Sequence, residues 1–129
     1  MIIKKLKHGA DLCEEIKAVC KKEKIQCGWF NAVGALKNLS LAFYDQKKKK
    51  YGTLKLKGAY EISSCMGNIS FADGEIFVHA HINAADEKGN VKGGHLLKSE
   101  IFAAELALFP SRKILKRKFD QTTGLKLWK

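Results

Sequence analysis

Residues 75–95 read EIFVHAHINAADEKGNVKGGH, and this stretch determines how the chain is expected to fold around its histidines. Its opening segment has strand character, so His79 and His81, two positions apart, project from the same face. The polar residues that follow predict a loop. The glycine pair Gly93-Gly94 then lets the backbone turn sharply. A hairpin of this length could bring His95 back beside the first two histidines.

Three converging imidazoles are a possible set of metal ligands. Three neutral histidines leave a fourth position of a tetrahedral ion open, which is typical of a reactive or ligand-binding zinc site. Nickel, copper or iron would accept the same ligands, so the pattern predicts zinc or another divalent transition metal. The spacing alone leaves an alternative open, in which His79 and His81 are two polar residues that face solvent or hydrogen-bond to their neighbours.

Outside this stretch, apolar and polar residues alternate through most of the sequence, and this period of two is typical of strands. Leu39, Leu41 and Phe43 alternate with Ser40, Ala42 and Tyr44, which predicts a half-buried strand. Residues 46–50 predict an exposed hairpin turn, residues 72–74 a tight turn, and residues 2–6 an edge strand. The further predicted strands are 28–36, 39–45, 51–58, 59–70 and 99–109.

Residues 9–25 carry the clearest helix signal of the chain. Apolar residues at positions i, i+4, i+7 and i+8 from Leu12 form one stripe, and Asp11 followed by Glu14 resembles a capping box. A short second helix is expected near Gly94–Leu97. Together the segments predict an α+β domain, with one large, mostly antiparallel β-sheet and one main α-helix packed on it.

The length and composition are those of a single domain spanning residues 1–129. With 46% hydrophobic residues, the chain can form a core of its own. It has no apolar run of about 18 residues and no apolar leader at its N-terminus. Cys13 and Cys20, seven apart in the predicted helix, are too distant for a disulfide. We therefore expect a cytoplasmic protein with four reduced thiols and no membrane partner.

The chain is strongly basic, with 24 Lys and Arg against 13 Asp and Glu and a net charge of +11. Such a field attracts polyanions, although a solvated lysine-rich surface explains the charge equally well. Only two basic residues are arginines, whose planar fork reads phosphates and base edges bidentately. The charge thus favours weak, salt-sensitive binding to duplex DNA. The candidate phosphate contacts are Lys47, Lys48, Lys49, Lys50, Arg112, Lys113, Lys116, Arg117 and Lys118.

Two motifs in this order, YEISSCMGNIS at 60–70 and VHAHINAADEKGNVKGGHL at 78–96, resemble the signature of the plants and prokaryotes conserved (PPC) domain. The G-x-D-L start of the helix, the segment GALKNLSLAFYD and the terminal DQTTGLKLW are similar to the same family. The domain is known from plant AT-hook proteins and as a stand-alone prokaryotic protein. The resemblance implies an α+β fold, a homotrimer and a metal held by histidines matching His79, His81 and His95.

The plant proteins bind DNA chiefly through the Arg-Gly-Arg-Pro core of the AT-hook, which this chain lacks. The resemblance therefore implies a nucleic-acid-associated regulatory module without an AT-hook. The alternative function is a zinc-dependent enzyme or a small-ligand-binding protein that uses the three-histidine site. Zinc lowers the pKa of a bound water towards 7, and Glu61 and Glu105 are candidates for a general acid or base. Either glutamate could instead form an ion pair or hydrogen-bond to a metal-binding histidine.

Overall fold

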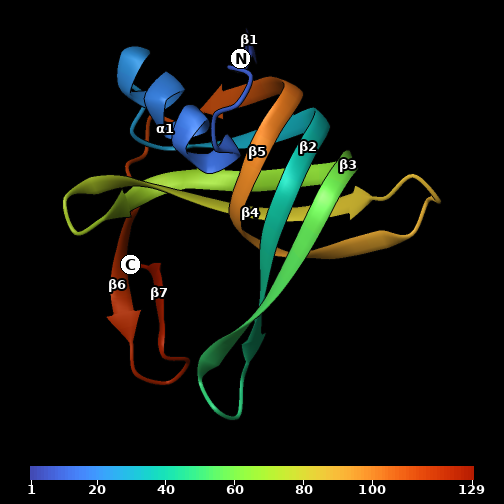
Figure 1. Cartoon of the computed structure of the whole chain (residues 1–129). Coiled ribbons are helices and arrows are strands. Elements are labelled where there is room, and N and C mark those ends of the chain that lie inside the picture. Colours follow the sequence, from blue (N-terminus) through green and yellow to red (C-terminus); the bar gives the residue numbers. More distant parts are fainter.

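Four long strands dominate the fold, which we describe for residues 1–129 from a computed structural model (Figure 1). One 11-residue helix and three short strands complete it. The predicted α+β class, with one large sheet and one helix, is confirmed. The elements are β1 (Ile2–Lys5), α1 (Leu12–Lys22), β2 (Gly28–Asp45), β3 (Lys50–Ala72), β4 (Glu75–Ala85), β5 (Val91–Pro110), β6 (Lys116–Asp120) and β7 (Leu125–Trp128).

The long strands pair in a closed cycle, in which β2 pairs with β3, β3 with β4, β4 with β5, and β5 with β2. All four pairings are antiparallel. The cycle closes at His95 of β5, which pairs with Ala42 of β2 and with His81 of β4. The predicted edge strand β1 pairs with β5, whereas β6 pairs with the end of β3 in parallel and forms the C-terminal hairpin with β7.

Helix α1 contacts β4 and β5, and in Figure 1 it lies above β4 and beside the upper part of β5. It begins after Asp11, whose Oδ1 accepts the backbone N–H of Glu14 at 3.0 Å, as in the predicted cap. The other carboxylate oxygen of Asp11 accepts the backbone N–H of Ser99 and ties the helix start to β5. Leu12 and Ile16 are fully buried in the core. The helix is neither long nor apolar enough to cross a membrane.

Several local predictions are wrong. Gly94–Leu97 is part of β5 and not a second helix, because this stretch pairs with both β2 and β4. Phe43 is 77% exposed and not on a half-buried face, because the β2–β3 hairpin extends beyond the core into solvent (Figure 1). The segments predicted as separate strands join into β2 and β3, with irregularities in β2 near Gly34 and Asn38. Strands β6 and β7 were not predicted, whereas both predicted hairpin turns are present.

The four cysteines belong to the core and not to a reactive centre. Cys20, Cys27 and Cys65 are buried, and Cys13 is partly buried. Desolvation by burial is the main reason why the pKa of Cys13 and of Cys65 rises to about 12. The thiolate form of Cys13 and Cys65, which would be the nucleophile or metal ligand, is therefore strongly disfavoured at neutral pH.

Gly67 of β3 marks a very close approach between the sheet and a core side chain. A Cβ at this position would lie 2.2 Å from the carbonyl oxygen of His79 and 2.4 Å from the ring of Phe30. Because Phe30 is fully buried, its ring has no free space into which to move.

We expect Gly67→Ala to lower the free energy of unfolding by about 1–3 kcal/mol, because the added methyl group overpacks the core. Gly52→Ala is the matched control in the same strand, since the nearest atom to its Cβ would lie 3.9 Å away. Its free energy of unfolding should stay within about 0.5 kcal/mol of the wild-type value. Urea unfolding measures both, and a fully stable Gly67→Ala variant would contradict this close packing.

Candidate metal centre

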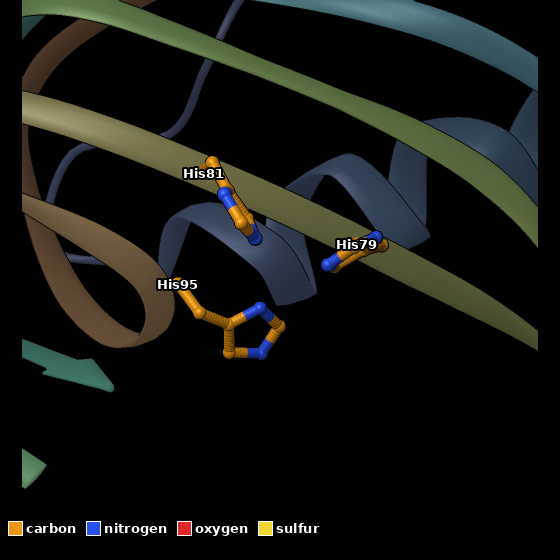
Figure 2. A group of neighbouring side chains, drawn as sticks. All are labelled: His79, His81 and His95. Atoms are coloured by element: carbon orange, nitrogen blue, oxygen red, sulfur yellow. The ribbon is translucent and has the colours of Figure 1, made fainter. Parts of the chain in front are cut away.

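His79, His81 and His95 converge where the β4–β5 ladder ends (Figure 2). His79 and His81 leave the same face of β4, while Ala80 between them is buried in the core. His95 lies directly opposite His81 in the antiparallel register. One ring nitrogen from each histidine lies within 4.8 Å of the other two, and the ring centroids are 5.0 to 5.6 Å apart. The fold thus brings together the three histidines that the sequence pattern singled out.

The two glycines before His95 are needed because β5 is crowded on both sides at this point. A Cβ at Gly93 would lie 3.0 Å from the carbonyl oxygen of Ile82 on β4, and one at Gly94 would lie 2.8 Å from the carbonyl oxygen of Ala42 on β2. Their role is therefore close backbone approach, which lets β5 run between two strands. The predicted sharp turn lies earlier, in residues 86–90.

The surroundings of His79 and His95 favour their neutral imidazoles. Burial, followed by the charges of His95, Arg117 and His81, lowers the pKa of His79 to about 4. Burial is also the main cause of the lowered pKa of His95. Neutral imidazoles offer lone pairs to a metal. In addition, Nδ1 of His95 is buried without a hydrogen-bond partner, which is costly for a polar atom. These residues therefore fit a divalent transition ion.

The cluster opens onto a cavity of about 710 Å³ between the β4–β5 region and two hairpins. One is the β2–β3 hairpin, which contributes Tyr51, and the other is the C-terminal β6–β7 hairpin, which contributes Arg117 and Lys126. The ring of Tyr51 lies 5.5 Å from that of His95. The cavity wall includes all three histidines and contains no Asp or Glu. A metal bound here would have room for a further ligand.

Arg117 lies at this centre and not on the basic surface where the sequence analysis grouped it. Its Nη2 is 3.5 Å from Nδ1 of His79 and donates to Oδ1 of Asn68 at 2.8 Å. Its Nε donates to Oγ of Ser70 at 2.8 Å. The only sequence signal for this role was the scarcity of arginine in a lysine-rich chain.

The other predicted site residues lie outside the cluster. Glu61 is exposed on β3 opposite Ala85, four residues beyond His81 along β4. Glu105 is exposed on β5, ten residues beyond His95. Neither side chain lines the cavity. The remaining predicted phosphate contacts are exposed side chains, in the β2–β3 turn and near β6, namely Lys47, Lys48, Lys49, Lys50, Arg112, Lys113, Lys116 and Lys118.

The family model described as the Plants and Prokaryotes Conserved (PCC) domain, also abbreviated PPC, matches residues 1–109. The chain belongs to this family. Among curated proteins it is 32% identical over 120 residues to the bifunctional protein GlmU of a Synechococcus strain. That alignment covers 90% of this chain and 18% of the relative, so the chain spans about a fifth of the length of this much longer protein.

Solved structures of prokaryotic proteins resemble nearly the whole chain. A PPC protein from Pyrococcus horikoshii is 40% identical with a TM-score of 0.93, covering 99% of this chain and 90% of its own. A metal-containing protein from Archaeoglobus fulgidus is 36% identical with a TM-score of 0.94, covering 98% and 91%. A candidate DNA-binding protein from Bacteroides thetaiotaomicron is 26% identical with a TM-score of 0.92, covering 98% and 90%.

In the metal-free protein, we expect the free energy of unfolding to decrease as the pH falls from about 6.5 to about 4. The folded state holds the pKa of His79 near 4, whereas the unfolded value is about 6.5. In this window the unfolded chain binds a proton that the native chain does not, which favours unfolding. Urea unfolding at successive pH values, with a chelator present, should show a shallower dependence for His79→Gln. Identical profiles for the two proteins would contradict the lowered pKa.

Proposed function

We propose that this PPC protein is a cytoplasmic homotrimer that binds zinc, or another divalent transition ion, through His79, His81 and His95, and that a small ligand reaches the open side of the ion. The observation that carries the proposal is the convergence of three imidazole nitrogens within 4.8 Å of one another. The unpartnered Nδ1 of His95 supports it, because ligation would satisfy that atom. When bound, such an ion supplies Lewis acidity and lowers the pKa of coordinated water.

A similar protein and the size of the cavity support a metal centre that binds a small ligand. The similar protein from Archaeoglobus fulgidus is metal-containing. The cavity at the histidines is large enough for a small organic molecule, in the range of about 300–1,000 Å³ that ligand pockets occupy. Glu61 and Glu105, the candidates for acid–base chemistry, do not line it. We therefore propose a ligand-binding metal centre and assign neither glutamate to catalysis.

Elemental analysis after mild dialysis tests the metal site. We expect about one zinc per wild-type chain and none in His95→Ala, because two remaining imidazoles bind zinc much more weakly than three. His8→Ala is the matched control, since His8 is the remaining histidine of the chain and its Nδ1 bonds instead to the carbonyl oxygen of Phe102. This control should keep its zinc, and both variants should unfold cooperatively. Equal zinc in wild type and His95→Ala would rule out the three-histidine site.

An exposed apolar face supports the homotrimer. Paired strand positions place Trp29 beside Phe109, and Ile3, Val33 and Met66 continue the same face across β1, β2 and β3. All five are between 42% and 68% exposed, and such a strip is typical of an association surface. Met66 lies opposite the exposed His81 in the register, so a neighbouring copy on this face would approach the metal centre.

Light scattering tests this assembly. The wild-type protein should have a mass of about 43 kDa, three times the 14.4 kDa of one chain. We expect Trp29→Glu to shift the protein towards monomer, because it would place an unpaired charge in a desolvated interface. Phe119→Glu, which changes an exposed aromatic residue of β6 outside this face, should leave the mass unchanged. A monomeric wild-type protein would refute the homotrimer.

The charge of the chain supports a second candidate function, weak binding to duplex DNA. The net charge is +11, and Lys47–Lys50 all lie exposed at the turn between β2 and β3. The similar protein from Bacteroides thetaiotaomicron is a candidate DNA-binding protein. Arg117 is withdrawn from the proposed phosphate contacts because its side chain hydrogen-bonds inside the cavity. The proposed contacts are therefore nearly all lysines, which favours binding that is indifferent to sequence.

We expect replacement of Lys47, Lys48 and Lys50 by serine to weaken DNA binding equally for all duplex sequences and to reduce its salt dependence. Lys49 stays in place, because its Nζ donates to the carbonyl oxygen of Gln121 and helps to join two hairpins. Fluorescence anisotropy at several salt concentrations measures the effect. Tight binding to one particular sequence at physiological salt would contradict this candidate function.

A further inference from the structure

Arg117 carries a positive charge that no acidic side chain of the protein balances. The protein forms four ion pairs, and none includes Arg117. Its three hydrogen-bond partners within 3 Å are neutral oxygens, belonging to Ser70, Asn68 and the backbone of Lys126. The other cation in the cavity wall, the ammonium of Lys126, is paired with Asp73. The cavity therefore contains one guanidinium without a counter-ion.

The guanidinium is held rigidly and does not extend freely into solvent. Ser70 and Asn68, which accept its hydrogen bonds, are themselves buried, with 0% and 8% exposure. The rings of Phe77 and Trp128 lie 5.0 and 5.5 Å from its central carbon. Of its five N–H groups, three are used by the neutral oxygens. One N–H remains on Nη1, and one remains on Nη2, whose nitrogen lies 3.5 Å from Nδ1 of His79. Such a preorganised fork suits an oxoanion better than a mobile lysine does.

The position of Arg117 beside the histidines defines which oxoanion would fit. Nη2 is 3.5 Å from Nδ1 of His79, so a ligand that contacts the guanidinium also reaches the histidine cluster. The cavity wall also includes the apolar side chains of Phe77, Leu125 and Leu127, which suit a carbon skeleton. A carboxylate paired with the fork, with a second oxygen on the neighbouring carbon, could span both groups.

We propose that the cavity binds a small organic carboxylate with a hydroxyl or carbonyl oxygen next to the acid, and that Arg117 recognises its carboxylate. The inference rests on the proposed metal centre, because the second oxygen would be directed to the histidine-bound ion. Arg117 lies on β6, beyond the residues 1–109 that match the family model. The C-terminal hairpin thus supplies the residue that selects for negative charge.

Isothermal titration calorimetry on the zinc-loaded full chain tests the proposal with two matched compounds, 2-hydroxyisobutyrate and its neutral amide. The amide has the same carbon skeleton but lacks the negative charge of the carboxylate. We therefore expect the acid to bind at least about tenfold more tightly, because it can form a charged, hydrogen-bonded pair with Arg117. This comparison needs only the wild-type protein. Zinc content is measured after each titration to exclude extraction of the metal by the acid.

Three variants then assign the effect to Arg117. Arg117→Gln should remove the preference for the acid, and Arg117→Lys, which keeps the charge but loses the fork, should retain only part of it. Lys57→Gln is the matched control, because it removes one positive charge from an exposed position outside the cavity. It should bind the acid as the wild-type protein does. Each variant is first checked for cooperative unfolding and bound zinc.

The outcomes separate this inference from the proposed metal centre. A wild-type chain without stoichiometric zinc would refute the metal centre itself. A zinc-loaded chain that binds acid and amide equally, or binds neither, would overturn the role of Arg117 and leave the metal centre standing. Inorganic phosphate binding as tightly as the organic acid, with the same dependence on Arg117, would overturn the assignment to organic carboxylates.

Discussion

The antiparallel register between β4 and β5 places His81 directly opposite His95, and the whole candidate site depends on it. Side chains on paired strands share a face only in the correct register, and a slip of one residue would turn His95 away from the other two histidines. The turn at 86–90 holds this register through Asp86, whose Oδ1 accepts the backbone N–H groups of Lys88 and Asn90 at 2.9 Å. A short polar turn, far from any chemistry, thus sets the geometry of the centre.

The closed cycle of strands explains why the centre lies where it does. Around His95, β5 pairs on one side with β2 and on the other with β4, and the two preceding glycines let the three backbones approach closely. The imidazoles therefore come from rigid paired strands and not from loops, which is a suitable basis for a precise ligand set. The β2–β3 and β6–β7 hairpins then extend past the core and form the cavity beside the centre. The histidines consequently come from two of the four long strands, whereas much of the remaining cavity wall comes from the two hairpins.

The sequence patterns correctly predicted the structural features that depend on short-range periodicity. The paired His79 and His81, the cap at Asp11 and the two hairpin turns followed from local spacing, and each is present. What the patterns missed depends on contacts between distant segments. The pairing of β5 on both sides turned the expected helix at Gly94–Leu97 into a strand. Arg117 is far from the histidines in sequence, and only the parallel pairing of β6 with β3 carries it to them.

The central claim is that three imidazoles from β4 and β5 hold one metal ion with an open side towards the cavity. X-ray absorption spectroscopy at the zinc edge of the loaded protein tests it most directly, because it counts the imidazoles bound to the ion. The account predicts three imidazole nitrogens at about 2.0–2.1 Å and one exchangeable oxygen ligand. A sulfur ligand, a fourth imidazole or fewer than three imidazoles would contradict it.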